Sequence, residues 1–208
     1  MWRHGRTRWN LEDRFQGHTD VELDATGRAQ AHRAARLLAA LNPVAVVSSD
    51  LRRARDTAEA LAQVAGVAVA EDPRLRETYG GTWQGLTVGE IQSLDAQAYE
   101  LWRSGADVPA GGAETRTEVA ARVTPAILDA LEPVPAGETL VVVTHGGSAR
   151  AAIGTLLQLP LDRWAVIGGL SNCCWSVLEE RPGGGEREWR LVEHNAGSLP
   201  TPVMSDDE

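Results

Sequence analysis

Largely apolar runs of strand length, each followed by a helix-forming pattern, dominate the chain. Residues 44–48 and 139–144 are two such runs, and a strand that is apolar on both faces is typical of a parallel sheet buried between helices. Apolar residues at helical spacing predict helices over residues 24–41, 51–65, 96–103 and 119–131, and over the segment that ends at residue 157. The alternation predicts an α/β fold, a three-layer α/β/α sandwich with a mostly parallel central sheet.

Shorter patterns complete the predicted sheet. Residues 67–70 predict a short strand, and residues 173–178 and 188–192 predict a hairpin around a Pro-Gly-Gly-Gly turn. This hairpin is expected to give the sheet an antiparallel edge strand. We expect one domain over residues 1–195 and a disordered acidic tail over residues 196–208. Ligands of such sheets bind beyond the carboxyl ends of the strands, so functional residues are expected directly after strands.

The charged residues exclude several functions. Lysine is absent, so all 20 basic residues are arginine, and 29 acids give a net charge of -9. Without lysine there can be no P-loop, no Schiff base and no lysine general base. The negative net charge opposes binding to nucleic acid or to an anionic membrane. Any bound anion must therefore meet a local cluster of arginines.

Cysteine usage and the start of the chain bear on its location. Cys173 and Cys174 are adjacent and are the only cysteines, too few for a disulfide framework or a four-ligand zinc site. The first residues do not resemble a signal peptide, and the longest apolar runs are too short to span a membrane. We expect a reducing, cytoplasmic location, no metal and no cofactor. A homodimer is plausible, although no sequence pattern indicates one.

Four separate motifs carry residues suited to phosphate chemistry. Arg3 and His4 stand in Arg-His-Gly, and His145 follows the apolar run 139–144 and precedes two glycines. Glycines allow backbone N–H groups to approach a ligand closely. Arg53 begins a helix after the run 44–48, and Glu77 precedes a glycine-rich turn. Two histidines, two arginines and one acid are the groups needed to transfer a phosphoryl group through a covalent histidine.

The order and spacing of these motifs resemble the histidine phosphatase superfamily, in its phosphoglycerate-mutase-like branch, from residue 3 to about residue 195. The resemblance implies that His4 is the nucleophile and Glu77 the proton donor. It also implies that Arg3, Arg53 and His145 hold the phosphate. The substrate pocket is expected to include Asn10, Gln16, Gly17 and Gly146.

Elementary chemistry agrees with these roles. His4 must attack as neutral imidazole, and the ordinary pKa of histidine, about 6.5, leaves most of it neutral at pH 7. Two arginines and a cationic His145 are expected to offset the charge of the phosphate. The phosphate charge beside Glu77 would favour the protonated carboxyl that the leaving alkoxide needs.

Longer strings resemble one subfamily more specifically. Residues 48–54, 75–87 and 172–175 look like the corresponding strings of actinobacterial glucosyl-3-phosphoglycerate phosphatases, which implies a small phosphorylated sugar acid as substrate. Phosphoglycerate mutases carry a longer insertion between the acid and the second histidine, where this chain has 67 residues. Hydrolysis is therefore favoured. A phosphoglycerate mutase and a non-catalytic protein that binds a phosphorylated metabolite remain the alternatives.

The chain departs from the family pattern in three places. Only two residues precede Arg3, so the strand that normally leads into the first motif is expected to be missing, and we favour a start further upstream. Arg6 replaces an acid or amide and is expected to add positive charge near the pocket. Ala113 interrupts a Gly-Gly-Glu run.

Other residues have ordinary interpretations. His18, His32 and His194 have no spacing partners and are expected to lie at the surface or in caps. Only two tryptophans, Trp9 and Trp83, lie near the site motifs. The wall that selects the substrate is expected to come from residues 86–114. Each site residue also has an alternative interpretation, as a solvated surface group or a packed strand-end side chain.

Overall fold

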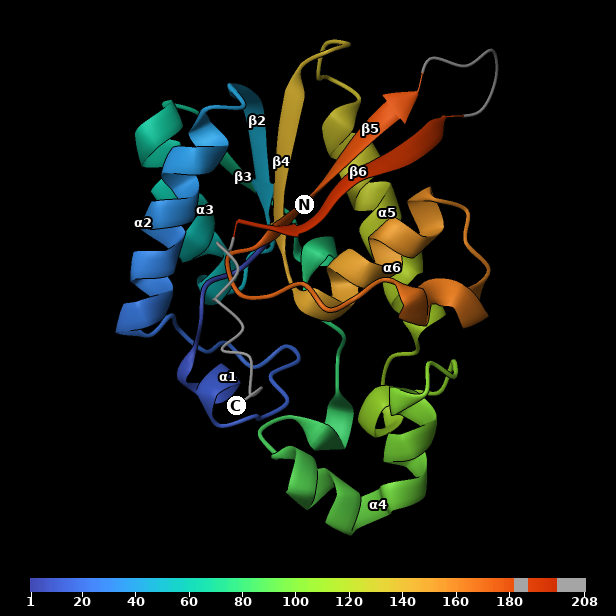
Figure 1. The fold of residues 1–208 in the computed structure, drawn as a ribbon. Helices are drawn as coiled ribbons and strands as arrows, with labels where there is room; N and C mark the ends of the chain where they lie inside the picture. Colours follow the sequence, from blue (N-terminus) through green and yellow to red (C-terminus); the bar gives the residue numbers. More distant parts are fainter. Residues whose placement is uncertain (182–186, 198–208) are drawn as a thin grey trace, which may run out of the picture.

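The fold contains one mixed sheet and helices on both of its faces (Figure 1). A computed structural model describes residues 1–181 and 187–197. Its strands are β1 (Trp2–Arg3), β2 (Pro43–Ser48), β3 (Val69–Glu71), β4 (Thr139–Thr144), β5 (Trp175–Arg181) and β6 (Glu188–Ala196). Its α-helices are α1 (Arg8–Leu11), α2 (Ala25–Ala39), α3 (Arg52–Ala65), α4 (Val88–Arg103), α5 (Arg116–Leu131) and α6 (Gly146–Leu156). Short 3-10 helices are η1 (Pro73–Leu75), η2 (Gly81–Trp83), η3 (Ala110–Gly112) and η4 (Leu161–Val166).

The strand order of the sheet is β3-β2-β4-β1-β5-β6. The first four strands are parallel, β5 is antiparallel to β1, and β6 is antiparallel to β5. The prediction of a mostly parallel sheet with an antiparallel edge is therefore confirmed. The predicted Pro-Gly-Gly-Gly turn, at residues 182–185, lies outside the described residues.

Alternate residues of the central strands fill two separate hydrophobic cores. Val46 of β2 and Val141 of β4 pack with α2 and α3, whereas Val47 and Val142 pack with α5 and α6. Successive side chains of a strand point to opposite faces, so burial of both sets requires a helical layer on each side. The three-layer α/β/α sandwich is confirmed (Figure 1).

The first strand lies at the centre of the sheet. The chain was expected to lack this strand, but Trp2 and Arg3 form a two-residue strand between β4 and β5. Trp2 is fully buried, and its indole N–H donates to the carbonyl of Cys173 at 3.1 Å. Burial of this one large side chain compensates for the few backbone pairs that so short a strand makes.

Two helices begin earlier than apolar spacing predicted. Helix α4 starts at Val88, and α5 starts at Arg116. In each case a capping box precedes the helix, with Thr87 and Thr115 as the N-cap residues. Such a cap satisfies free N–H groups of the first turn, so each helix can begin before its first buried residue.

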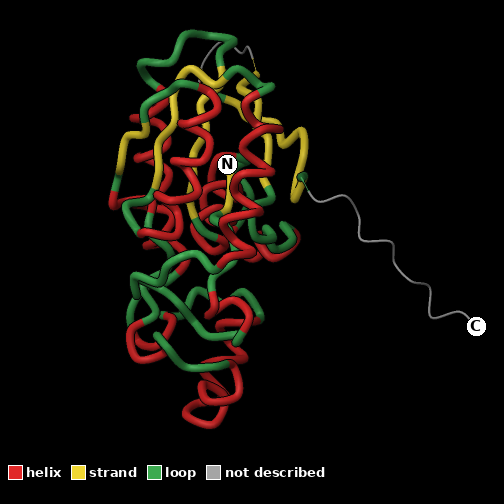
Figure 2. Tube along the Cα trace, turned by 90° about the vertical axis from the view of Figure 1, so that its left-hand side faces the viewer, coloured by secondary structure: helices red, strands yellow, loops and turns green. Residues whose placement is uncertain are grey.

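A smaller lobe containing α1 and α4 extends beyond one end of the sheet (Figure 1), and the tube trace in Figure 2 shows its helices and loops lying below the strands. Its core is aromatic, and edge-to-face pairs join Phe15, Trp83 and Trp102. The backbone of α4 departs from helical geometry at Asp95, just before the half of the helix that the sequence predicted. No helix in the described part of the chain is both long and apolar enough to cross a bilayer.

The end of the chain differs from the expected boundary by a few residues. Strand β6 runs to Ala196, beyond the predicted limits of the strand at residue 192 and of the domain at residue 195. Residues 198–208, most of the predicted acidic tail, lie outside the described residues.

Candidate active site

One pocket of about 310 Å³ lies at the carboxyl ends of β1, β2 and β4. The lining includes eight of the nine residues predicted for the site: Arg3, His4, Arg53, Glu77, Asn10, Gln16, Gly17 and Gly146. The ninth residue is His145, whose ring centroid lies 5.1 Å from that of His4. The fold thus brings together motifs that are up to 142 residues apart in the sequence.

His4 directly follows β1 and is almost fully buried. Its Nδ1 lies 2.7 Å from the carbonyl oxygen of Gly5. Because a carbonyl only accepts, Nδ1 carries the proton, and the lone pair of His4 is on Nε2. Burial, followed by the charges of Arg53 and Arg3, lowers the pKa of His4 well below its ordinary value. The ring is therefore neutral at pH 7, as a nucleophile must be.

His145 directly follows β4 and is the N-cap residue of α6. Its Nε2 lies 2.9 Å from the hydroxyl oxygen of Ser49, and this oxygen accepts from the backbone N–H of Leu51. With the Ser49 hydroxyl as the donor to Nε2, the ring proton of His145 is on Nδ1. Nδ1 is buried and has no hydrogen-bond partner in the described structure.

The surroundings of His145 favour its neutral ring. Burial, followed by the charges of Arg53, His4 and Arg3, lowers the pKa of His145 well below its ordinary value. In the unliganded pocket the ring is neutral rather than cationic. It can still donate one hydrogen bond through Nδ1.

Two buried arginines lie beside the histidines. Arg53, in the first turn of α3, donates to the carbonyls of Thr19 and Gly17 at 2.8 and 2.7 Å. Arg3 donates to the carbonyl of Leu170 at 2.6 Å. The Nε atoms of both arginines are buried and have no hydrogen-bond partner among the described residues. Burial lowers the pKa of Arg53 to about 10, which leaves it charged at neutral pH.

The side chain of Glu77 lies at the N-terminal end of α6. Its carboxylate accepts from the backbone N–H of Thr78 at 2.9 Å and from those of Gly147 and Ser148 at 3.1 Å. The positive end of the helix dipole favours an anion here. A Cβ at position 147 would lie 2.5 Å from Glu77 Oε1, so glycine permits this approach.

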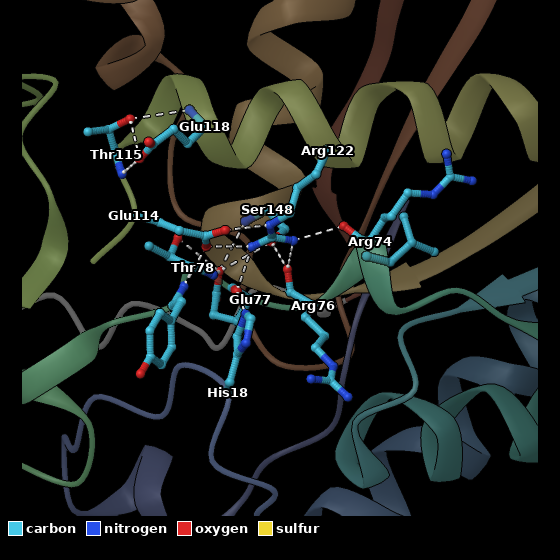
Figure 3. A network of polar contacts seen from close by, with 12 residues as sticks. His18, Arg74, Arg76, Glu77, Thr78, Glu114, Thr115, Glu118, Arg122 and Ser148 are labelled. Carbon is cyan, nitrogen blue, oxygen red and sulfur yellow. Dashed lines mark hydrogen bonds and ion pairs between the residues drawn. The ribbon is translucent and has the colours of Figure 1, made fainter.

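A polar network fixes the backbone of Glu77 (Figure 3). The carbonyl of Glu77 accepts from His18 Nε2 and from Arg122 Nη2, both at 2.8 Å. Arg122 also donates to the carbonyls of Arg74 and Arg76, which come shortly before Glu77 in the sequence, and to the carboxylate of Glu114. The interpretation of His18 as an ordinary surface residue was therefore wrong, and its distance in sequence from Glu77 gave no signal of the contact.

The four predicted substrate-binding residues differ in how they contribute. Gly17 and Gly146 contribute backbone, and the carbonyl of Gly17 fixes Arg53. Gln16 accepts from the hydroxyl of Thr7 at 3.0 Å. Asn10 Oδ1 accepts from Asn172 Nδ2 at 3.2 Å, and the same amide donates to the carbonyl of His4 at 3.1 Å. Asn172 thus supports His4 and Asn10, although sequence reasoning gave it no such role.

The remainder of the pocket corrects three expectations. Of residues 86–114, only Trp102 lines the pocket, and the wall opposite comes mainly from α5, α6 and residues 164–170. Trp102 and Trp164 line the pocket, whereas Trp9 and Trp83 do not. Arg6 is not among the lining residues, because its Nε pairs with Asp24 at 2.8 Å.

A cysteine nucleophile and a metal centre are less well supported by the structure than the histidine pair. Burial raises the pKa of Cys173 to about 12, so this thiol is protonated and is a poor nucleophile. In residues 1–181 and 187–197, no three His, Cys, Asp or Glu side chains are grouped as a metal site. The histidine pair is the best nucleophilic centre in the described pocket.

Comparison with known proteins identifies relatives along almost the whole chain. The family model of the histidine phosphatase superfamily (branch 1) matches residues 1–196. The chain is 41% identical over 209 aligned residues to the glucosyl-3-phosphoglycerate phosphatase of Mycobacterium tuberculosis, an alignment that covers 95% of this chain and 94% of that protein. It is also 42% identical to phosphoglycerate mutase-like protein 4 of Arabidopsis thaliana, over 72% of this chain and 66% of that protein.

A solved structure agrees with this result. A mycobacterial glucosyl-3-phosphoglycerate phosphatase in complex with VO3 superposes with a TM-score of 0.89 and 40% identity, and the match covers 95% of this chain and 98% of that chain. The fold and these relatives define a phosphoric monoester hydrolase. The chain belongs to the histidine phosphatase superfamily, branch 1.

Proposed function

We propose that the protein hydrolyses phosphomonoesters through a phosphohistidine at His4. The observation that carries the proposal is the meeting of two neutral histidine rings, 5.1 Å apart, beside two buried arginines. A guanidinium and a phosphate charge about 4 Å apart attract by roughly 4 kcal/mol at an effective dielectric of 20. Arg3 and Arg53 can thus hold a dianion within reach of His4.

In the first step, Nε2 of His4 attacks the phosphorus atom and the bond from phosphorus to the ester oxygen breaks. The charge of the bound phosphate favours the protonated carboxyl of Glu77, which gives its proton to the departing alkoxide. The unpartnered Nδ1–H of His145 and the free Nε–H groups of Arg3 and Arg53 donate to the phosphoryl oxygens. Gly5 holds the other nitrogen of His4, so the attacking lone pair stays on Nε2.

In the second step, a water molecule attacks the phosphorus atom of phospho-His4. Glu77 accepts a proton from this water, the N–P bond breaks, and Nε2 regains its lone pair. Inorganic phosphate leaves, and both groups return to their starting protonation. The chemistry proposed needs no metal and no cofactor.

The proposed substrate is glucosyl-3-phosphoglycerate or a related small phosphorylated sugar acid. Support comes from the name and the 41% identity of the mycobacterial relative and from the 67 residues between Glu77 and His145. Mutase action is the second candidate, because the similar plant protein is named mutase-like. We further propose a cytoplasmic location, which the two buried free thiols support.

Phosphate release in EDTA tests the proposal. The substrates are glucosyl-3-phosphoglycerate, 3-phosphoglycerate and an aryl phosphate, each with wild type and His4→Ala. We expect phosphate from wild type in EDTA and a loss of at least 10³-fold in the variant. Isomerised phosphoglycerate in place of phosphate would favour the mutase. Equal rates in wild type and His4→Ala would overturn the proposed nucleophile, and no turnover of any substrate would favour a non-catalytic binding protein.

A further inference from the structure

The pocket holds more positive charge than a phosphate requires. Its lining contains five arginines and one acid, Glu77. Arg14 is paired with Glu12 at 2.8 Å and with Glu90 at 3.3 Å. Two of the remaining four arginines, Arg3 and Arg53, flank His4. The last two, Arg116 and Arg150, have no role in the phosphate chemistry proposed above.

Arg116 is fixed in place without an acidic partner. As the first residue of α5, it donates to the carbonyl of Ala106 at 3.1 Å and to that of Trp102 at 2.6 Å. Its guanidinium lies 5.0 Å from the centroid of the Trp102 ring. Among the described residues, no carboxylate lies within 4.0 Å of it. The nearby acid, Asp107, bonds to Thr117 instead.

Arg150 lies on α6, four residues after Gly146. Residues four apart share a face of a helix and are separated by about 6 Å along its axis. A Cβ at Gly146 would lie 3.7 Å from Arg3 Nε, which marks the phosphate end of this face. Arg150 Nε is buried without a hydrogen-bond partner in the described part of the chain. Arg150 therefore lies one helical turn beyond the phosphate end.

The two arginines act on each other. The charge of Arg150, after burial, lowers the pKa of Arg116, and Asp107 opposes the shift. Like charges that face one partly enclosed cavity repel, so a bound anion would relieve an existing cost. A planar carboxylate matches the fork of a guanidinium.

We propose that Arg116 and Arg150 form a second anion subsite that binds the carboxylate of a phosphorylated acid. This inference rests on the proposed function, because it assumes that phosphate occupies the end beside His4. Because Glu77 is protonated in the proposed substrate complex, a phosphate dianion offsets two of the charges of Arg3, Arg53, Arg116 and Arg150, and one carboxylate offsets a third. A carbon–carbon bond is about 1.5 Å long, so the chain of a small acid can span one helical turn.

A matched pair of substrates tests the subsite. 3-Phosphoglycerate and glycerol 3-phosphate differ by a carboxylate in place of a hydroxymethyl group. In wild type, we expect kcat/KM to be higher for the acid. In Arg116→Gln and Arg150→Gln, the ratio of the two kcat/KM values should fall by about 10- to 100-fold, mainly through KM of the acid. Arg150→Lys keeps the charge and should recover part of the ratio.

Arg163→Gln is the matched control, because it removes an exposed arginine that is paired with Asp162 and is not among the residues that line the pocket. Its ratio should stay within about threefold of wild type. Thermal unfolding confirms that each variant is folded. Failure of wild type to hydrolyse these two esters, glucosyl-3-phosphoglycerate and an aryl phosphate would overturn the proposed function. Hydrolysis of both esters with an unchanged ratio in the Gln variants would overturn the subsite alone, as would stronger inhibition by glycerol bisphosphate than by 3-phosphoglycerate.

Discussion

Two neutral imidazoles among buried guanidinium groups are the central feature of this molecule at the residue scale. The pKa of each ring is lowered first by burial and then by Arg53. The lowered pKa keeps His4 free to attack and leaves His145 as a neutral donor. Both effects come from the folded surroundings and are absent in the unfolded chain.

This arrangement predicts a dependence of stability on pH. A histidine with a lowered pKa in the folded state binds more protons when unfolded, so the free energy of unfolding falls as pH drops through about 6.5. The fall is at most about 1.4 kcal/mol per pH unit for each histidine. Urea unfolding at pH 7.5, 6.5 and 5.5, in a buffer without phosphate, measures the slope. The free energy of unfolding should change less steeply with pH in His4→Gln than in wild type. An equal slope in the two proteins would contradict the lowered pKa of His4.

Residue types at strand ends predicted the pocket, but the partners of those residues could not be predicted. Arg3 and His4 were found through the Arg-His-Gly motif, and His145 was found because it follows an apolar run and precedes two glycines. Ser49, Asn172 and His18 act through hydrogen bonds to groups 59 to 168 residues away. No local pattern of the sequence encodes such distances.

At the scale of elements, helix α5 holds the segment that carries Glu77. Arg122 joins α5 to the carbonyls of Arg74, Arg76 and Glu77, while Glu114 accepts from its guanidinium (Figure 3). The planar guanidinium of Arg122 donates to three carbonyls and one carboxylate at the same time. The ammonium of a lysine has only three donors and no fixed fork, so it cannot make all of these contacts.

Arg122→Lys should therefore displace Glu77 without removing a charge. We expect kcat for an alkyl phosphate to fall about tenfold more than kcat for an aryl phosphate, because only the alkoxide depends strongly on a proton from Glu77. Steady-state kinetics with both esters measures this difference. Arg103→Lys, in an exposed pair with Glu100, is the control. An equal fall for both esters would show a merely structural role for Arg122.

Elements with periodic apolar residues were predicted well, and those with other signals were not. Strand β4 matches its predicted limits of residues 139–144, because its four inner residues, 140–143, form a continuous apolar run. The first half of α4 was missed, since its capping box and not its apolar spacing marks its start. The prediction of the substrate wall failed because α5 and α6 pack together over the pocket, a tertiary effect.

At the scale of the whole molecule, the shortest strand has the central place. β1 contributes two residues between the parallel strands and the β5–β6 hairpin, and it leads directly into His4. Composition and periodicity could not predict it, because two residues have no period. Its place is fixed by Trp2, which is fully buried against residues of both neighbouring strands.

Trp2→Ala should accordingly destabilise the fold by about 3–5 kcal/mol, the usual cost of truncating a buried tryptophan. Trp2→Phe should cost less, since it keeps an aromatic ring and loses the hydrogen bond to Cys173. Urea denaturation followed by circular dichroism measures both values. A loss below about 1 kcal/mol in Trp2→Ala would contradict this account of the sheet.

The covalent intermediate gives the most direct test of the proposed chemistry. An aryl phosphate with a radiolabelled phosphoryl group, whose leaving group depends little on a proton from Glu77, is mixed with wild type, Glu77→Gln and His4→Asn, and the reactions are stopped in alkali, where a phosphoramidate survives. Peptide mapping should locate the label on His4, with more label in Glu77→Gln and none in His4→Asn. Label on another residue, or steady turnover by wild type with no label on His4, would contradict the account.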